Sequence, residues 1–288
     1  MARLNVKNYG AMGDNKTDDT VAFQKTVDAA KSGDTVYVPA GNYMIDAIKS
    51  VKLKSNIQFE MYHTAILKVI PNDATHYFLL KVYNCKNVKI KKGTLQGDRQ
   101  KHTPTVHPKW TPNVAFNRYG EWGLGLDIRG SQDITVSNVT SRDMWGDGFY
   151  VDHKGSTRSK NIKFDYCTGL NNRRQGLSVI DVNGLEVRNS EFSTTHGTKP
   201  ADGIDLEVDK PHATYGKGII ENVLIVDCKF RNNQGAGVEI AVKKGIGRNI
   251  RVARCQFSGN NKSIKSDTFS WWQKIWYEIF GHPKSIKV

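Results

Sequence analysis

Two carboxylates, Asp205 and Glu207, stand two residues apart in the segment Gly203-Ile-Asp-Leu-Glu. Apolar residues alternate with them, so in a β-strand both carboxylates face the same side, about 6.6 Å apart. Acids at this spacing suit general acid/base chemistry, and hydrolysis of a glycosidic bond with inversion uses carboxyl groups roughly 6.5 to 9.5 Å apart. The predicted acid and base are therefore Asp205 and Glu207. Asp152 and Asp202 are the alternative partners.

The strand that carries this pair is one of a set with the pattern Gly-apolar-x-apolar-x. The set comprises Gly125-Leu-Asp-Ile-Arg, Gly148-Phe-Tyr-Val-Asp, Gly176-Leu-Ser-Val-Ile, Gly203-Ile-Asp-Leu-Glu and Gly237-Val-Glu-Ile-Ala. The outward positions hold Asp127 and Arg129, Tyr150 and Asp152, Ser178 and Ile180, Asp205 and Glu207, and Glu239 and Ala241. Clustered like charges raise some carboxyl pKa values and a nearby arginine lowers others, which yields one protonated acid and one ionised base.

Polar residues just before these strands form a second predicted column, made of Asp147, Gln175 and Asp202. Arg173 and Arg174 precede the Gln175 strand. Guanidinium groups hold carboxylates and phosphates through paired hydrogen bonds. We therefore expect the two arginines to bind an anionic group of a substrate.

A second set of segments begins with a polar residue or glycine and continues as an alternating strand. It comprises Asn87-Val-Lys-Ile, Asp133-Ile-Thr-Val, Asn161-Ile-Lys-Phe, Gly184-Leu-Glu-Val, Asn222-Val-Leu-Ile and Asn249-Ile-Arg-Val. Six residues after each start lie Gly93, Val139, Cys167, Ser190, Cys228 and Cys255, a column of mostly small side chains. Two short strands per repeat, with no helical period between them, predict an all-β parallel β-helix whose coils stack in one solenoid.

The expected organisation has three parts. Residues 1–45 form an N-terminal cap of strand, helix and strand, and residues 46–265 form the parallel β-helix, with loop insertions at 97–122 and 193–202. Residues 266–288 form a C-terminal cap. Such caps cover the unpaired edges and the core at the ends of a solenoid.

Both caps have apolar faces that can cover an end coil. The capping helix is expected within residues 17–31, starting with the Thr17 hydroxyl and burying Phe23, Val27 and Ala30 on one face. The C-terminal cap is rich in large apolar residues. They are Phe269, Trp271, Trp272, Ile275, Trp276, Ile279 and Phe280.

Charge and composition exclude several classes of protein. The 42 basic and 28 acidic residues give a net charge of 42 − 28 = +14. The sequence contains no run of 18 apolar residues, which a membrane-spanning helix would need, and no apolar signal segment. The basic residues are dispersed and the outward ladder is acidic, which argues against a nucleic-acid partner.

The cysteines are not expected to form disulfides. Cys167, Cys228 and Cys255 are expected as thiols in the core, and Cys85 is expected to be unpaired.

Several segments carry a family resemblance. They are the run from Asn5 to Thr20, Gly33-Asp-Thr-Val-Tyr-Val-Pro-Ala-Gly-Asn-Tyr, Gly97-Asp-Arg, Gly120-Glu-Trp-Gly, Trp145-Gly-Asp-Gly and Asn172-Arg-Arg-Gln-Gly. They resemble the signatures of the pectate-lyase-like right-handed β-helix superfamily, which includes bacteriophage tailspike depolymerases and related proteins of Gram-positive bacteria. The resemblance implies a carbohydrate-active depolymerase on a virion tail or a cell surface, with a homotrimer as its expected assembly. Its expected substrate is an anionic cell-surface or cell-wall polysaccharide.

The predicted substrate-binding residues follow from these motifs and from the outward ladder. They are Asp98, Arg99, Glu121, Trp122, Trp145, Asp147, Tyr150, Arg173, Arg174 and Gln175. The tryptophans, with Trp110 and Tyr150, are candidates for stacking on sugar rings. His153 and His196 are secondary acid/base candidates.

Alternative activities stay open on this scaffold. A calcium-assisted polysaccharide lyase would use Asp143, Asp147 and Asp152 near Arg173, whereas hydrolysis requires no cofactor. A teichoic-acid phosphodiesterase and a non-catalytic glycan adhesin are further alternatives. The polygalacturonase family has a similar Gly-Ile-Asp strand, but its paired Asp-Asp and its Gly-His-Gly are missing here, so that family is not favoured. His102 and His107 lack the partners for a zinc site.

Overall fold

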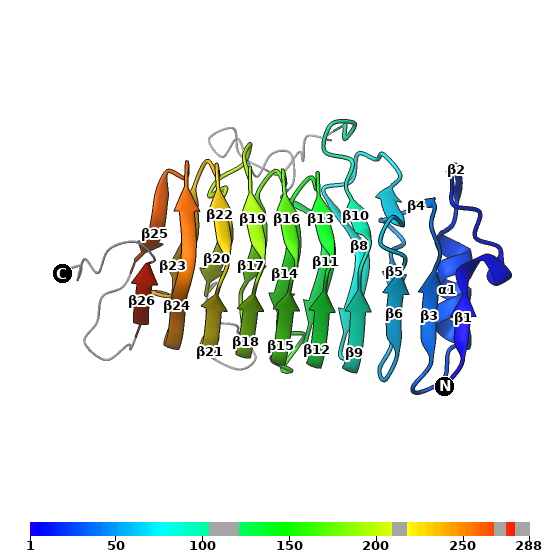
Figure 1. Cartoon of the computed structure of the whole chain (residues 1–288), viewed down its shortest axis with the longest axis horizontal. Coiled ribbons are helices and arrows are strands. Elements are labelled where there is room, and N and C mark those ends of the chain that lie inside the picture. Colours follow the sequence, from blue (N-terminus) through cyan, green and yellow to red (C-terminus); the bar gives the residue numbers. More distant parts are fainter. Residues whose placement is uncertain (104–120, 209–217, 268–274, 280–288) are drawn as a thin grey trace.

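The computed structural model describes residues 1–103, 121–208 and 218–267, together with the backbone of 275–279. In these ranges the chain winds into stacked coils whose strands pair in parallel with those of the neighbouring coils (Figure 1). The strands form three ladders that run along the molecule. This confirms the predicted all-β parallel β-helix.

The first ladder contains β1 (Arg3–Asn5), β3 (Thr35–Val38), β6 (Gln58–Met61), β9 (Lys86–Lys91), β12 (Gln132–Ser137), β15 (Ser159–Asp165), β18 (Val182–Arg188), β21 (Ile219–Val226), β24 (Ile246–Ser258) and β26 (Ile275–Ile279). The second contains β2 (Asp14–Asp18), β4 (Asn42–Ile45), β7 (Ile66–Val69), β10 (Thr94–Gln96), β13 (Thr140–Arg142), β16 (Thr168–Leu170), β19 (Glu191–Ser193), β22 (Lys229–Arg231) and the end of β24. The third contains β5 (Val51–Lys52), β8 (His76–Tyr83), β11 (Trp122–Arg129), β14 (Asp147–Asp152), β17 (Gln175–Val179), β20 (Ile204–Glu207), β23 (Ala236–Ala241) and β25 (Lys262–Ser266).

The second ladder corrects the expectation of two strands per repeat. Most of its strands are three residues long, as in β13, β16 and β19. A three-residue strand is too short to display an alternating pattern of its own. Large side chains stand eight residues after four of the six repeat starts, at Leu95, Phe192, Phe230 and Phe257, and these positions lie on this ladder. Phe192, Phe230 and Phe257 stack there with centroid distances of 6.0 and 5.0 Å.

The polar residues that open the sequence repeats share an unusual backbone conformation. Asn87, Asp133, Asn161, Gly184, Asn222 and Asn249 all have positive φ, between 52° and 85°. Gly, Asn and Asp tolerate this left-handed region better than other residues. Each of these coils needs such a residue near the start of its first-ladder strand, which explains why the repeat can be recognised in the sequence.

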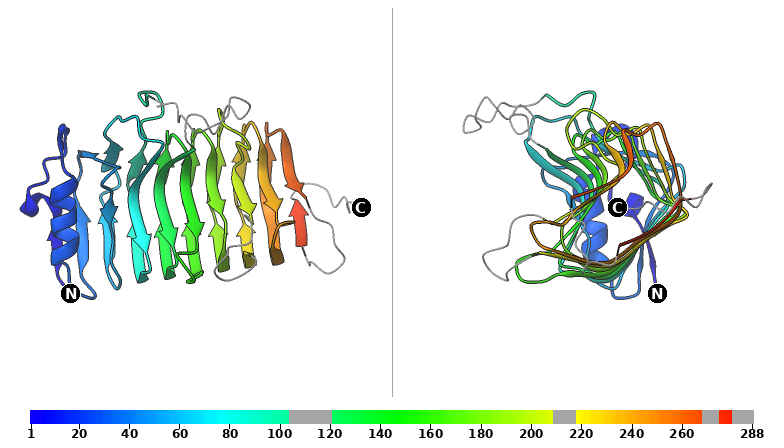
Figure 2. Two further views of the ribbon diagram at one scale, coloured as in Figure 1. Left: turned by 180° about the vertical axis from the view of Figure 1, so that it is seen from behind. Right: turned by 90° about the vertical axis from the view of Figure 1, so that its left-hand side faces the viewer.

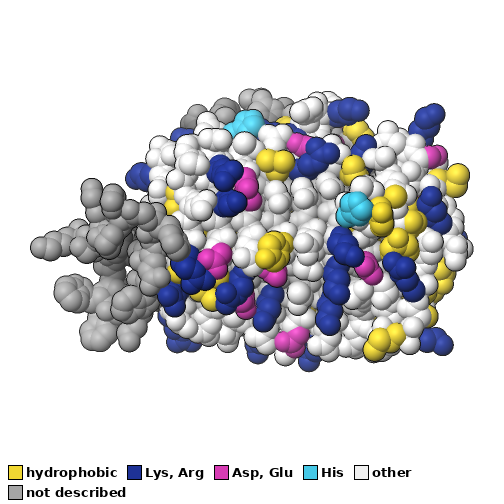
Figure 3. Space-filling view, in the orientation of Figure 1, with side chains coloured by type: hydrophobic (Ala, Val, Ile, Leu, Met, Phe, Trp, Pro, Cys, Tyr) yellow, Lys and Arg dark blue, Asp and Glu magenta, His cyan; other side chains and the backbone are white. Residues whose placement is uncertain are grey.

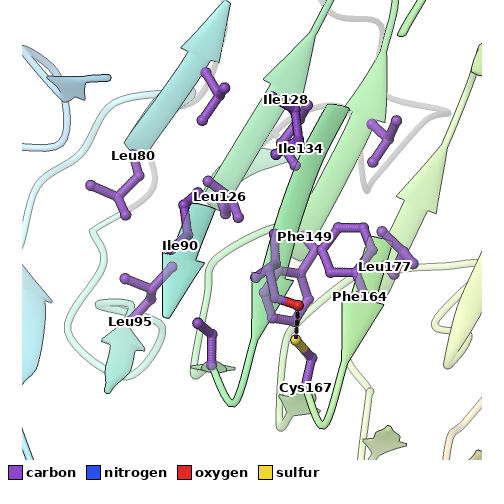
Figure 4. Close-up of a cluster of buried hydrophobic side chains, with 14 of the residues drawn as sticks. Leu80, Ile90, Leu95, Leu126, Ile128, Ile134, Phe149, Phe164, Cys167 and Leu177 are labelled. Atoms are coloured by element: carbon purple, nitrogen blue, oxygen red, sulfur yellow. Dashed lines mark hydrogen bonds between the residues drawn. The ribbon is translucent and has the colours of Figure 1, made fainter. Parts of the chain in front are cut away.

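The core fills the space between the ladders. Leu80, Leu126, Phe149 and Leu177 from the third ladder point inward with Ile90, Ile134 and Phe164 from the first (Figure 4). All of these side chains are buried. The Cys167 thiol donates to the Val136 carbonyl in the same region, and all four cysteines are free and buried (Figure 4).

A short 3-10 helix, η1 (Val6–Tyr9), and the helix α1 (Thr20–Ala29) lie at the N-terminal end of the stack (Figure 2). Phe23, Val27 and Ala30 are buried. The helix begins later than expected, because Thr17 lies in β2 and the N-cap is Asp19. Asp19 makes no capping bond; its carboxylate accepts instead from the Met12 and Gly13 N–H groups.

At the C-terminal end, β26 adds a strand parallel to β24. The side chains of the predicted aromatic cap lie outside the described residues, so that cap stays a prediction. No helix in the described part of the chain is long and apolar enough to span a membrane.

Long loops leave the stack beside the third ladder. Residues 194–203 join β19 to β20, whereas four residues make the same connection between β16 and β17. The expected insertion at 97–122 continues from β10 to β11, but residues 104–120 lie outside the described ranges. The face shown in Figure 3 carries Lys and Arg side chains scattered over most coils, with acidic side chains between them.

Candidate active site

The outward positions of the third ladder form one column. Its register aligns Asp127, Tyr150, Ser178, Asp205, Glu239 and Lys265. The predicted column is present, but its acids are not solvated: Asp127, Asp205 and Glu239 are 0%, 2% and 8% exposed. Buried acids are costly unless they are paired or protonated, so a column of them marks a candidate functional site.

Arg174, in the turn before β17, contacts carboxylates from three other segments. Its Nη1 lies 3.1 Å from Asp147 Oδ2, its Nε 3.4 Å from Glu121 Oε2 and its Nη2 3.9 Å from Glu207 Oε2. Ser178 Oγ donates to the same Asp147 oxygen over 2.9 Å. Burial disfavours the charge of Arg174, but the carboxylates outweigh it and hold the pKa of the guanidinium above its ordinary value.

Two of these carboxyl groups are altered by their surroundings. Burial raises the pKa of Asp147 to about 6, although Arg174 and Ser178 lower it. The Oδ1 atom of Asp147 is buried and has no hydrogen-bond partner among the described residues. Burial also raises the pKa of Glu121. Arg174 is therefore a fixed cation beside two carboxyl groups, Asp147 and Glu121, whose pKa values are raised.

The predicted acid/base pair lies in this group, and its members differ sharply. Gln175 Nε2 donates to Asp205 Oδ2 over 2.8 Å, while the other Asp205 oxygen meets no donor among the described residues. Burial and the charge of Glu207 raise the pKa of Asp205 well above its usual value. By contrast, 31% of the Glu207 side chain is exposed. The buried acid and the accessible carboxylate stand on the same strand.

Asp202 lies at the end of the inserted loop, next to Asp205. Its Oδ1 accepts from the Ala236 N–H, and Gln175 Oε1 accepts from the Asp202 N–H over 2.6 Å. Burial and a side-chain hydrogen bond with Glu239 raise the pKa of Asp202 to about 8. Gln175 thus links Asp202 to Asp205.

Arg129 organises a second group on neighbouring coils. Its Nε lies 2.8 Å from Asp127 Oδ1 and its Nη1 3.4 Å from Asp152 Oδ2. Its guanidinium carbon is 4.6 Å from the Tyr150 ring centroid, and His153 Nδ1 is 2.7 Å from Asp152 Oδ1. The structure therefore places Asp152 with Tyr150 and His153 rather than beside Glu207.

The two described tryptophans that were candidates for stacking on sugar rings, Trp145 and Trp122, differ in their contacts and exposure. Trp145 stacks on His102 at 4.3 Å and carries the Arg173 guanidinium 3.8 Å above its ring. Burial lowers the pKa of Arg173 to about 10. Trp122 is 44% exposed and touches His76 edge-on, which leaves it the more accessible ring. Trp110 and His107 lie outside the described residues.

The side chains of Asp98 and Arg99 form hydrogen bonds with neighbouring segments and loops. Asp98 accepts from the Tyr77 hydroxyl over 2.6 Å and lies 3.0 Å from His102. Arg99 donates to the Asn171 carbonyl over 2.8 Å and to the His196 carbonyl over 2.6 Å. Neither makes a described hydrogen bond or ion pair with the acid column.

The three acids of the calcium alternative fall into separate groups. Asp143 accepts from Asn171 and pairs with Arg142, Asp147 belongs to the Arg174 group, and Asp152 belongs to the Arg129 group. Among the described residues no set of three or more His, Cys, Asp or Glu side chains is arranged to hold a metal ion. Asp143, Asp147 and Asp152 therefore do not form one ligand set.

Sequence reasoning left Ser178, Glu239 and Lys265 out of the site. Ser178 bonds Asp147, and Lys265 Nζ lies 2.6 Å from Glu239 Oε1. Glu239 was recognised as outward-facing but given no role. The register that sets Glu239 opposite both Asp205 and Lys265 would have drawn attention to it.

Curated proteins of similar sequence come from bacteria. The uncharacterised YclG of Bacillus subtilis (strain 168) is 27% identical over 256 residues, which cover 81% of this chain and 42% of that protein. Mannuronan C5-epimerase AlgE4 of Azotobacter vinelandii is 32% identical over 158 residues, 50% of this chain and 27% of the enzyme. Exo-poly-α-D-galacturonosidase of Dickeya chrysanthemi is 24% identical over 267 residues, 91% and 41% respectively. This chain spans less than half the length of each.

Solved structures with a similar fold include two phage proteins. The pre-mature gene product 12 of bacteriophage phi29 has a TM-score of 0.71 at 19% identity, covering 91% of this chain and 34% of that one. Tailspike gp49 of the Acinetobacter baumannii bacteriophage Fri1, a capsular polysaccharide depolymerase, has a TM-score of 0.67 at 16% identity, covering 96% and 49%. At these identities the likeness establishes the fold.

Two families match the chain in sequence. Residues 3–68 match the family described as rhamnogalacturonase A/epimerase, pectate lyase-like, and residues 124–270 match the right-handed β-helix region. The second match covers about half of the chain and includes the strands that carry the acid column. The chain therefore belongs to the right-handed β-helix family, within the pectate-lyase-like superfamily.

Proposed function

We propose that the chain hydrolyses an anionic polysaccharide, with Asp205 as general acid and Glu207 as general base. The observation that carries this proposal is the contrast between the two groups. Asp205 is 2% exposed and its pKa is raised by burial, whereas Glu207 is partly exposed beside Arg174. Two residues apart on one face of β20, their Cα atoms are about 6.6 Å apart, which allows the two carboxyl groups to take the separation of roughly 6.5 to 9.5 Å that suits an inverting pair.

In this scheme each carboxyl group moves one proton. Asp205 donates its proton to the oxygen of the leaving sugar, and Glu207 takes a proton from the water that attacks the opposite face. Asp147 is a second candidate for the acid, because Arg174 contacts both Asp147 and Glu207. Since three carboxylates surround Arg174, its proposed role is to order these acids. Arg173 is the proposed contact for an acidic substituent of the polymer.

The related proteins support the substrate class. AlgE4 acts on mannuronan, the Dickeya enzyme on polygalacturonate and the Fri1 tailspike on a capsular polysaccharide, according to their names. Because this chain spans less than half of its curated relatives, its substrate, its place on a virion tail or cell surface and its assembly as a trimer are proposals.

The test is a product assay on a panel of anionic polymers with EDTA present, analysed by mass spectrometry. New reducing ends without unsaturation support hydrolysis. Asp205→Asn and Glu207→Gln should each lower kcat by about 10² or more while polymer binding persists, because each removes a proton-transfer group. Glu186→Gln, in a partly exposed group of ion pairs on the first ladder, is the matched control. Full activity of both site variants contradicts the assignment.

A second candidate function rests on the Arg129 group. Tyr150, Asp152 and His153 place a phenol, a carboxylate and an imidazole together beside a guanidinium. Such groups can remove the proton next to a uronate carboxylate, which leads to β-elimination or epimerisation. The relative AlgE4 is an epimerase by name. Unsaturated products, or solvent deuterium incorporated without cleavage and lost in Tyr150→Phe, would favour this candidate over hydrolysis.

A further inference from the structure

Two buried acids next to Asp205, namely Asp202 and Glu239, have no role in the proposed hydrolysis. Asp202, Asp205 and Glu239 are 1%, 2% and 8% exposed. In each of them one carboxyl oxygen is buried and receives no hydrogen bond from the described residues: Asp202 Oδ2, Asp205 Oδ1 and Glu239 Oε2. Buried oxygens without donors are rare in folded proteins, so this arrangement calls for protons on the acids themselves.

The ladder register forces these groups together. Glu239 stands directly opposite Asp205 on the next coil, and neighbouring strands are about 4.8 Å apart. Asp202 reaches the same coil, where its Oδ1 accepts from the Ala236 N–H of β23, the strand that carries Glu239. The neighbouring Glu239 contributes to the raised pKa of Asp202. Buried carboxyl groups that lie as close together as Asp202 and Glu239 do not both stay ionised.

A cation fixes which member of the pair keeps the negative charge. Lys265, directly opposite Glu239 on β25, places its Nζ 2.6 Å from Glu239 Oε1. No described lysine or arginine forms an ion pair with Asp202. The proton is therefore held on Asp202 and directed at the Glu239 carboxylate.

We propose that Asp202 and Glu239 share a single proton and act as a positioning pair that keeps the neighbouring Asp205 in its acid form. Asp205 lies between this pair and Glu207, with Gln175 bonded to both Asp205 and the Asp202 backbone. The negative charge retained by the pair opposes a second charge on Asp205. The inference rests on the proposed role of Asp205 as the general acid.

Other charged groups face Asp205 and must be taken into account. Glu207 lies on the same strand and raises the pKa of Asp205, as do Asp202 and Glu239, whereas Arg174 lowers it. Asp147 and Glu121 form ion pairs with Arg174. The Asp202–Glu239 pair differs from these groups because Lys265 contacts it. Removing Lys265 therefore changes the charge at the pair in the opposite direction to removing Glu239.

The experiment is a carboxyl ¹³C NMR titration of aspartate-labelled protein, with the Asp202 signal assigned through Asp202→Asn. In the wild type, Asp202 should titrate near pH 8. Glu239→Gln removes the charge and offers an amide donor, so the Asp202 titration should move down by about one pH unit or more. Lys265→Met removes the cation that favours the anionic pair, so the titration should move up.

The pH profile of cleavage gives the functional readout. In Glu239→Gln the alkaline limb of kcat/KM should move to lower pH, because Asp205 loses a negative neighbour and ionises earlier. A merely structural role would lower activity equally at all pH values. If Glu239→Gln fails to fold, the opposite shift in Lys265→Met keeps the test decisive.

The outcomes separate the inference from the proposed function. An Asp202 signal that titrates near pH 4, or that does not move in either variant, overturns the shared proton. An unmoved alkaline limb in an active Glu239→Gln variant overturns the role toward Asp205. If no polymer is cleaved, the proposed function fails, while the NMR titration still decides whether the proton is shared.

Discussion

At the scale of single residues, the site is a set of buried acids arranged around one guanidinium. Arg174 is surrounded by Asp147, Glu121 and Glu207, while Asp202 and Asp205 depend on protonation. Removing one partner from a buried charge group leaves the others uncompensated, which costs more than an exposed ion pair contributes. The Arg174 group should therefore matter for stability as well as for chemistry.

Arg174→Met should lower the free energy of unfolding by about 3 to 5 kcal/mol, because it leaves buried carboxylates without their cation. Urea unfolding at pH 7 measures this change. The loss should shrink toward pH 5, where Asp147, whose pKa is raised to about 6, takes up a proton and no longer needs the cation.

Arg188→Met provides the comparison, because Arg188 pairs with Glu186 on the first ladder and both side chains are partly exposed. It should change stability by no more than about 1 kcal/mol. Equal losses in the two variants would show that Arg174 is an ordinary surface cation.

At the scale of elements, the site exists because strands of successive coils align their outward residues one above another. Asp205 meets Ser178 on one side and Glu239 on the other through this register. This register depends in turn on the side-chain columns packed inside the coils. One of them is the stack of Phe192, Phe230 and Phe257, which lies on the coil that carries the inserted loop and on the coils that follow it. A defect in this stack should therefore reach both stability and the site.

Phe230→Ala should lower the free energy of unfolding by about 3 to 5 kcal/mol, since it removes the middle ring of a buried stack and leaves a cavity. Tyr166→Ala is the matched control, because Tyr166 is 59% exposed. Thermal and urea unfolding of both variants measure the difference. A small loss for Phe230→Ala would mean that the coils readjust around the gap.

At the scale of the whole molecule, the charge of +14 contrasts with the acidic column. Lys and Arg are scattered over most coils on the face shown in Figure 3, whereas Asp127, Asp205 and Glu239 of the acid column are buried. A dispersed positive charge attracts an anionic polymer at long range, and salt screens this attraction. We therefore expect the long-range attraction to come from the dispersed charge, while the proposed chemistry lies in the acid column.

Binding of an anionic polymer should weaken steeply between about 0.05 and 0.5 M salt, while a neutral analogue should bind with little salt dependence. Titrations of the Glu207→Gln variant, which is expected to lack cleavage activity, measure binding alone. Binding that is insensitive to ionic strength would remove long-range attraction as the role of the positive charge.

The sequence by itself determined the repeat, and with it the fold. Each coil needs a left-handed residue near the start of its first strand and an inward column, and both leave a signature in residue type at Asn87, Asn161 and Asn222. It also placed Asp205 and Glu207 on one face, because side chains alternate along a strand. These are local requirements that are repeated along the chain.

The tertiary structure decided which acids interact and which are protonated. Arg174 meets Glu121 and Asp147 across long stretches of chain, Asp152 joins Arg129 instead of Glu207, and Glu239 is set against Lys265. Burial and partners depend on loops and on the registry between coils, which no local pattern encodes. Since carboxyl chemistry is set by desolvation and by neighbouring charge, the roles of these residues follow from the folded arrangement.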